Sequence, residues 1–304
     1  MDGDVFVFPG QGAQYQKMGI SFYEHYPEAR AVFEEASDVL STSLTKLVFK
    51  SSHEELMLTK NSQISIFVVC SAILNVLRKE FPQLSPSMCG GLSLGEYTAL
   101  MASGRVSFVN ALRLVAARAQ HMHDASLELS GKMAAVIGMS ENEILNCGYS
   151  IANINSPNQI VISGMSNVID NAAIVLKNFG AKKVMPLEVS GAFHTNFMQS
   201  AKEKMVVLIE SLDMRDSFIG LVMNVVGDFV SDKSEIRHNL LEQIVSTTRW
   251  MDCFNSIKRR GGRCFYEIGP SQLASINRKI DKDVITIKIE KIEDLDNVYA
   301  NYAR

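Results

Sequence analysis

Cysteine is scarce in this chain of 304 residues, and it is not organised. The five cysteines (Cys70, Cys89, Cys147, Cys253 and Cys264) are odd in number and widely scattered, and no two of them form a C-x-x-C pair. This distribution argues against a disulfide framework and against a zinc site, and it fits a reducing cytoplasm. We therefore expect a cytoplasmic protein that binds no metal.

Excess charge and long apolar runs are also missing. The formal net charge is −3, with 21% charged and 47% hydrophobic residues, which is ordinary for a globular protein. The start, Met1–Asp4, has no basic segment like that of a secretory signal. No apolar run approaches the roughly 18 residues that a membrane span needs. We therefore expect neither nucleic acid nor membrane as a partner.

The first 130 residues alternate short apolar strands with helical segments. Strands are predicted at 4–8 and 88–90, and helices at 21–41 (interrupted at Pro27), 64–80, 96–103 and 108–126. Such an alternation is typical of a parallel α/β sheet.

The pattern changes near Gly131. Strands are predicted at 132–139, 150–155, 159–163 and 182–188, with helices from Ser140 and over 167–179. The order β-α-β-β-α-β is that of a ferredoxin-like module. We therefore predict an α/β class, with a parallel-sheet, α/β-hydrolase-like domain at 1–129 and 198–304 and a ferredoxin-like domain at 130–197. In the returning part, helices are predicted at 196–212, 233–245 and 252–260, a strand at 221–225, and a last core strand at 264–268.

The stretch Gly91–Gly95 has the pattern G-x-S-x-G and runs directly into a predicted helix. Such a pattern can place a serine on a sharp strand-to-helix turn, where the helix N-terminus favours an oxyanion beside the hydroxyl. The same pattern also occurs by chance in turns, so from this stretch alone Ser93 is a candidate nucleophile and no more.

A serine nucleophile needs a base. Of the six histidines, His194 is distinctive because it lies in a turn of small residues at the junction of the two predicted domains, where substrates commonly bind. A structural role for this histidine remains open.

Two further groups complete the candidate site. The segment 8–14 (FPGQGAQ) is a strand followed by a glycine-rich turn, which would let backbone amides or Gln11 face a ligand, although it fails as a dinucleotide fingerprint. Arg118 has apolar neighbours at helical spacing, so its guanidinium is predicted to face a buried carboxylate. That carboxylate belongs either to a substrate or to an internal ion pair.

Six motifs, in order, resemble those of the malonyl-CoA:acyl-carrier-protein transacylases and of the related acyltransferase domains of polyketide synthases. They are FPGQGAQ (8–14), GLSLGE (91–96), RAQHM (118–122), NINSPNQIVISG (153–164), GAFH (191–194) and EIGP (267–270). The resemblance extends over nearly the whole chain and includes the two-domain layout.

The resemblance implies a ping-pong mechanism. Ser93 would attack the thioester of malonyl-CoA, with His194 as general base, and the backbone amides of Gln11 and Leu94 would hold the oxyanion. The malonyl group would then pass to the phosphopantetheine thiol of an acyl carrier protein, and no cofactor is expected. Arg118 would pair with the malonyl carboxylate.

The resemblance also assigns residues to substrate binding. Phe193 would narrow the pocket and disfavour a branched acyl group, and Met122 and Gln63 would lie at the substrate. Asn155 and Gln159 would help to hold the pantetheine or CoA. Main-chain carbonyls would orient the histidine ring, and the backbone near Arg249 is the predicted acceptor.

Two positions depart from the family pattern. Leu92 stands where the family usually has a histidine, and Ser62-Gln63-Ile64 stands where Thr-Gln-Pro is usual. The GLSLGE form resembles the discrete acyltransferases that act in trans for polyketide synthases, whereas a housekeeping fatty-acid enzyme is the alternative.

Other functions remain to be weighed. A proofreading acyl hydrolase would be expected to lack Arg118, and a catalytically dead docking module would not need the intact set of site residues. An esterase of the α/β-hydrolase type would need an acid between Ser93 and His194, and none is evident.

Clusters at 258–263 and at Lys182-Lys183 could face an acidic carrier protein or be solvated surface charge. We expect a monomer.

Overall fold

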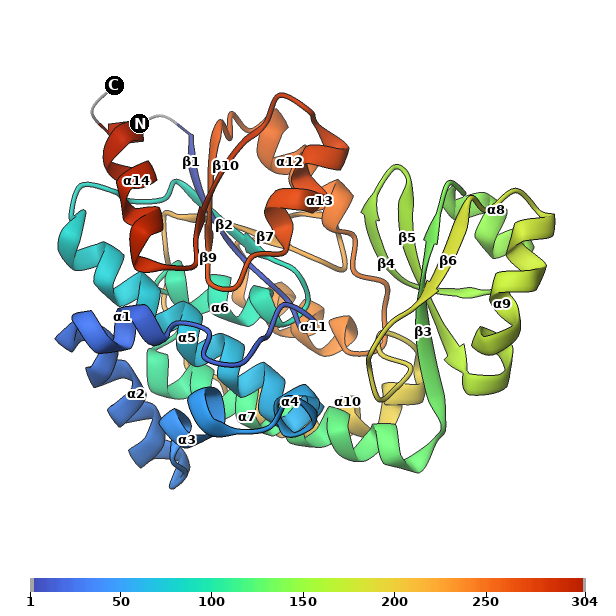
Figure 1. Ribbon diagram of the computed structural model, residues 1–304, viewed down its shortest axis with the longest axis horizontal. Coiled ribbons are helices and arrows are strands. Elements are labelled where there is room, and N and C mark those ends of the chain that lie inside the picture. The colour runs from blue at the N-terminus through green and yellow to red at the C-terminus, as the bar shows by residue number, and fades with distance from the viewer. Residues whose placement is uncertain (1–2, 303–304) are drawn as a thin grey trace.

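The computed structural model describes residues 3–302, which form two sheets lying side by side, each with its own helices (Figure 1). The larger sheet has the strand order β10-β9-β1-β2-β7-β8. Its strands are β1 (Asp4–Phe8), β2 (Met88–Gly91), β7 (Gly220–Met223), β8 (Asp228–Phe229), β9 (Cys264–Ile268) and β10 (Ile285–Ile289). All neighbours pair in parallel except β7 and β8.

Helices surround this sheet in the described part of the chain. They are α1 (Ile20–His25), α2 (Pro27–Leu40), α3 (Leu44–Lys50), α4 (His53–Met57), α5 (Thr59–Glu80), α6 (Leu94–Ala102), α7 (Phe108–Glu128), α10 (Gln199–Glu210), α11 (Lys233–Gln243), α12 (Trp250–Arg259), α13 (Leu273–Ile280) and α14 (Leu295–Tyr302), with 3-10 turns η1 (Asn196–Met198) and η2 (Ile292–Asp294). The break at Pro27 falls where the sequence predicts it, because proline is well tolerated in the first turn of a new helix.

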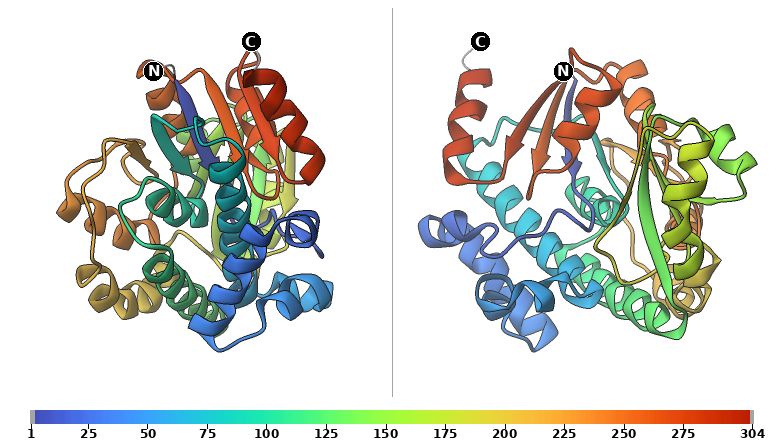
Figure 2. Two further views of the ribbon diagram at one scale, coloured as in Figure 1. Left: turned by 90° about the vertical axis from the view of Figure 1, so that its left-hand side faces the viewer. Right: turned by 45° about the vertical axis from the view of Figure 1, so that its right-hand side comes forward.

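The smaller sheet is antiparallel and has the strand order β4-β5-β3-β6. Its strands are β3 (Gly131–Ile137), β4 (Ser150–Ser156), β5 (Gln159–Met165) and β6 (Lys183–Pro186). The helices α8 (Glu141–Asn146) and α9 (Ser166–Asn178) cover the face that points away from the larger sheet (Figure 2). Ser140 and Glu143 form a capping box at the start of α8.

The predicted fold class is confirmed, but one element was misjudged. The strand at 264–268 is not the last strand of the core, because β10 pairs in parallel with β9 along its full length. In β10 the apolar side chains of Ile285, Ile287 and Ile289 alternate with Thr286 and Lys288, a pattern that fits a strand at the edge of a sheet.

Helix α5 is long and apolar enough to cross a membrane by length and composition, and 78% of its apolar window is buried inside the protein. It packs against α7 and α2 in the main hydrophobic core. Its apolar surface is therefore used to form the core that supports the larger sheet.

The two sheets are joined along the free edge of β4. Thr248 donates its backbone N–H to Ala152 and accepts a hydrogen bond from the backbone of Ile154, so the segment before α12 extends the smaller sheet. Arg249 adds an ion pair to Glu141, with 2.7 Å between Nη2 and Oε1. These contacts set the position of the smaller sheet relative to β2 and α6.

Candidate active site

Ser93 lies at the sharp turn between β2 and α6, as the sequence predicts. Its backbone has φ 52° and ψ −102°, which is unusual for a residue with a side chain. Gly91 and Gly95 make the turn possible, because a Cβ on Gly91 would overlap the Gly95 carbonyl and a Cβ on Gly95 would overlap that of Phe8. The N–H of Ser93 donates to Asn224 Oδ1 at 2.7 Å, which holds the turn from outside the motif.

His194 reaches this serine from the segment that follows β6. Its Nε2 lies 2.8 Å from Ser93 Oγ, and its Nδ1 lies 2.7 Å from the main-chain oxygen of Gln243. A carbonyl can only accept, so Nδ1 carries the proton and Nε2 is free to accept the serine proton. The prediction that the backbone near Arg249 orients the ring was wrong, because the end of α11 lies closer to His194.

Burial lowers the pKa of His194 to about 4, and the positive charge of Arg118 lowers it in the same direction. The lowered pKa keeps the ring neutral at pH 7, the form that a general base requires.

We predict that NMR of the imidazole will show His194 neutral down to about pH 4. Replacing Arg118 with methionine should raise this midpoint, because the repelling charge is removed. A wild-type midpoint at the ordinary value of 6.5 would contradict the geometry.

Arg118 comes from α7, and its guanidinium is directed at the same hydroxyl. Nη2 donates to Ser93 Oγ at 3.1 Å and to Gln243 Oε1 at 2.9 Å. Nη1 donates to Gln63 Oε1 at 2.6 Å, and the guanidinium carbon lies 5.0 Å from the centre of the Tyr97 ring. The side chain is only 1% exposed.

The alternative of an internal ion pair for Arg118 is excluded within residues 3–302, because no carboxylate there lies within 4.0 Å of it. All its hydrogen bonds go to neutral groups, and Nε has no partner in the described part of the protein. A buried charge that no carboxylate contacts is costly, and Glu96, whose charge acts on Arg118, is linked to it only through the Gln243 side chain. Its surroundings therefore favour the binding of an anion next to Ser93.

The main-chain N–H groups of Gln11 and Leu94 have no hydrogen-bond acceptor among the described residues. Leu94 begins α6, so its N–H is one of the unsatisfied donors of a helix N-terminus. The loop that carries Gln11 is held by Gln272, whose Oε1 accepts from Gly10 N at 2.8 Å. This arrangement leaves two donors free to hold an oxyanion.

A cavity of about 80 Å³ connects these groups. Of the predicted site residues, eight line it: Gln11, Gln63, Leu92, Ser93, Arg118, Met122, Phe193 and His194. Leu94, which would act through its main-chain N–H, does not line it, and neither do Asn155 and Gln159. Asn155 is buried in β4, whereas Gln159 accepts a hydrogen bond from Lys279 at the surface. Their role in holding pantetheine or CoA stays a prediction.

The sequence missed three polar residues of the site. Asn153 lines the cavity two positions before the predicted Asn155, in a strand whose regular pairing with β5 is interrupted on either side of Asn153 and Ile154. Asn224 and Gln243 are fully buried and contact the serine turn from distant elements. No local pattern around either residue marks it as functional.

Comparison with known proteins agrees with this geometry. A family model described as "Acyl transferase domain" matches residues 5–272. The chain belongs to this family.

Relatives match over almost the full length. Proteins named malonyl CoA-acyl carrier protein transacylase from Bacillus subtilis (strain 168) and Haemophilus influenzae are 35% and 33% identical, covering 96% and 97% of this chain and 95% and 97% of their own. A solved malonyl-transacylase in complex with a type II polyketide synthase acyl-carrier protein has a TM-score of 0.94 at 31% identity, covering 99% of this chain and 100% of that one.

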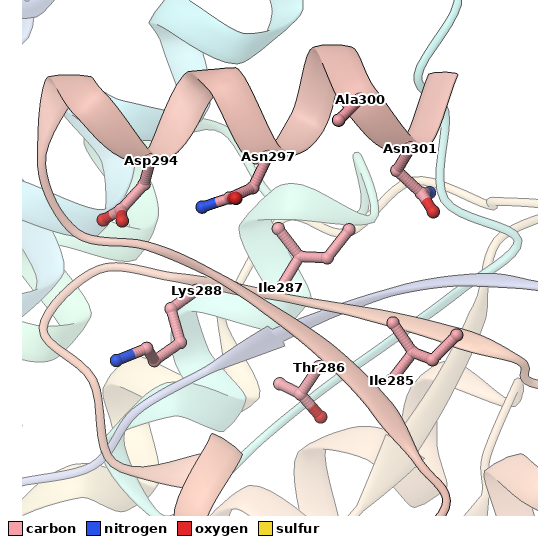
Figure 3. A pocket seen from close by; sticks show the side chains of 8 residues that line it. All are labelled: Ile285, Thr286, Ile287, Lys288, Asp294, Asn297, Ala300 and Asn301. Carbon is pink, nitrogen blue, oxygen red and sulfur yellow. The ribbon is translucent and has the colours of Figure 1, made fainter. Parts of the chain in front are cut away.

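Four larger hollows in the described part of this acyl transferase domain hold none of the predicted site residues. One of about 380 Å³ lies between β10 and α14, lined mainly by isoleucine, threonine and asparagine side chains (Figure 3). Among the described residues, no group of three or more His, Cys, Asp or Glu could hold a metal.

The two basic clusters differ in position. The cluster at 258–263 includes the end of α12 and contacts Gly3 at the amino end of β1, whereas Ser93 follows the carboxyl end of β2. Lys258 in this cluster is paired with Asp281. Lys182-Lys183 lie at the start of β6, whose other end leads to Leu187 and Val189 in the cavity wall. Only the second cluster therefore connects directly to the site.

Proposed function

We propose that this protein transfers a malonyl group from malonyl-CoA to the phosphopantetheine thiol of an acyl carrier protein, through a malonyl ester on Ser93. The observation that carries this proposal is Arg118, a buried guanidinium without a carboxylate partner that lies 3.1 Å from Ser93 Oγ. The names of the relatives support the same donor and acceptor.

In the first half-reaction, Ser93 Oγ passes its proton to His194 Nε2 and attacks the thioester carbonyl carbon. The carbonyl oxygen becomes an oxyanion, which the N–H groups of Gln11 and Leu94 stabilise. The carbon–sulfur bond then breaks, and His194 returns the proton to the departing CoA thiolate. The malonyl group remains as an ester of Ser93.

In the second half-reaction, the carrier thiol occupies the place that CoA has left. His194 accepts the thiol proton, the sulfur attacks the ester carbonyl, and the same donors hold the new oxyanion. The ester bond breaks and Ser93 recovers its proton from His194. Throughout both steps Arg118 is proposed to bind the malonyl carboxylate with two parallel hydrogen bonds.

The proposed selectivity for a short, unbranched acyl group is supported by the cavity. Its volume of about 80 Å³ is small, and Phe193 and Met122 form part of its apolar wall. A methyl branch would have to displace packed side chains, which is unfavourable in a close-packed interior.

We further propose that the carrier belongs to a polyketide synthase, because Leu92 gives the GLSLGE form typical of trans-acting enzymes. A fatty-acid carrier is the alternative, and the curated relatives carry names that fit it equally well.

The reaction needs no cofactor. A cytoplasmic setting is supported by the five free cysteines.

We predict that a panel of acyl-CoAs will load carrier protein with malonate in preference to acetate, methylmalonate and longer neutral chains. Mass spectrometry of the intact carrier reads this directly, and fatty-acid and polyketide carriers tested side by side decide between the two pathways. A proofreading hydrolase would instead release free acid and leave the carrier unloaded, which would overturn the proposal.

A further inference from the structure

Glu96, the last residue of the GLSLGE motif, lies directly behind the nucleophile. It is in the first turn of α6 and is fully buried. Its Oε1 accepts from Gln243 Nε2 at 2.9 Å, and its Oε2 accepts from the backbone N–H of Asn224 at 2.5 Å. It does not line the cavity and forms no ion pair within residues 3–302. Substrate binding therefore does not account for a buried acid at this position.

The first neighbour, Gln243, contacts all three groups of the proposed mechanism. Its side-chain oxygen accepts from Arg118, and its Nε2 also donates to the main-chain oxygen of Ser93 at 3.0 Å. Its main-chain oxygen accepts from His194 Nδ1. The orientation of this one residue thus affects the base and the arginine together.

The second neighbour, Asn224, holds the turn itself. Its Oδ1 accepts from Ser93 N and its Nδ2 donates to the Gly91 oxygen at 2.8 Å. These two bonds lie at either end of the strained segment that presents the hydroxyl.

Both neighbours present donors to Glu96, and this explains why an acid is required. A carboxylate accepts both hydrogen bonds, which fixes the Gln243 amide with its nitrogen toward Glu96 and its oxygen toward Arg118. A glutamine at this position would direct an N–H₂ group at one of the two donors. Gln243 could accept a hydrogen bond from that N–H₂ group only if its own amide rotated by half a turn. Its nitrogen would then face the Arg118 guanidinium, which is also a donor.

We propose that Glu96 is a positioning residue that holds the nucleophile, the base and the arginine in one arrangement. This proposal rests on the proposed function of those three groups. In other sites an acid that contacts the catalytic histidine directly holds its ring in place. Here Glu96, which never touches substrate, would hold the histidine indirectly.

The charged and titratable groups around Glu96 come from three elements. Arg118 lies on α7, Cys253 on α12, and Tyr97 is the next residue of α6. Burial raises the pKa of Glu96 to about 8, while the N–H of Asn224 and the charge of Arg118 act in the opposite direction. As the pH falls through this range, the carboxylate takes up a proton and acquires a donor that faces two other donors.

The test compares Glu96→Gln with Thr98→Val. Thr98 lies on the same helix, is equally buried, and its hydroxyl has no hydrogen-bond partner in the described structure, so its loss leaves the network intact. The first readout is the rate at which methanesulfonyl fluoride, a small neutral reagent, modifies Ser93. The second is the preference for malonyl-CoA over acetyl-CoA. Thermal unfolding of each variant checks the fold.

We expect Glu96→Gln to slow sulfonylation by at least about tenfold and to lower the malonyl preference by a similar factor, while Thr98→Val matches wild type. A folded Glu96→Gln protein with wild-type values for both readouts would overturn the proposal. Sulfonylation needs neither malonyl-CoA nor carrier, so it tests the role of Glu96 even if the proposed transfer reaction fails.

If Glu96→Gln does not fold, Glu96→Asp supplies the test. The shorter side chain keeps the carboxylate but cannot reach both Gln243 and Asn224 from the same backbone position, so sulfonylation should again slow by at least about tenfold. A folded Glu96→Asp protein that is modified at the wild-type rate would overturn the proposal.

Discussion

Replacing Ser93 with alanine is expected to lower malonyl transfer on the order of 10³-fold or more, because no other group can form the acyl ester. The change removes only the hydroxyl. Alanine has the same Cβ, so the turn with φ 52° is no more strained than before, and the bond from the backbone N–H to Asn224 is kept. The rate of CoA thiol release in the presence of carrier protein measures the effect.

Ser65→Ala is the matched control for this substitution. Ser65 is fully buried in α5, and its hydroxyl has no hydrogen-bond partner in the described structure. We expect this variant to transfer malonate at the wild-type rate. Transfer by Ser93→Ala at a rate close to that of Ser65→Ala would show that the nucleophile lies elsewhere.

Replacing Arg118 with alanine is expected to abolish the preference for malonyl over acetyl groups. Removing one partner from a buried ion pair costs roughly 3–5 kcal/mol, which corresponds to a loss of roughly 10²- to 4 × 10³-fold in kcat/KM for malonyl-CoA. Acetyl-CoA has no carboxylate to lose, so its kcat/KM should change much less. Competition between the two thioesters for the same enzyme measures the ratio.

The control for Arg118 is a second buried arginine with a structural role. Arg105 donates to the main-chain oxygen of Ile219 and does not line the cavity. Arg118→Lys should weaken malonyl preference because lysine lacks the planar pair of donors, whereas Arg105→Lys should leave the preference unchanged. Equal selectivity in both lysine variants and wild type would mean that Arg118 does not bind the malonyl carboxylate.

The parts of the site that depend on local chain geometry could be predicted from sequence. The turn at Ser93 needs a strand, small residues on either side and a following helix, and all of these are adjacent in the chain. His194 was located by its place at the junction of two predicted domains. Its contact with Ser93, across 101 positions, could be anticipated only from family resemblance.

The supporting residues could not be predicted, because their roles arise from tertiary packing. Gln243 is the last residue of an otherwise ordinary polar helix, and its contacts with Ser93 and Glu96 span 150 and 147 positions. The sequence around Arg249 gives no indication that a main-chain oxygen of α11 accepts the hydrogen bond from the His194 ring. The strand β10 was missed for a different reason: its isoleucines at 285, 287 and 289 alternate with polar residues in the period of a strand, and this local signal was overlooked.

The central claim is that the acyl group passes through an ester on Ser93. Incubating the wild-type protein with isotopically labelled malonyl-CoA, without carrier, and mapping the peptides by mass spectrometry tests this directly. We predict one labelled peptide that contains Ser93, with one CoA thiol released for each label, and transfer of the label when carrier protein is added. An unlabelled protein, or equal labelling of Ser93→Ala, would contradict the mechanism.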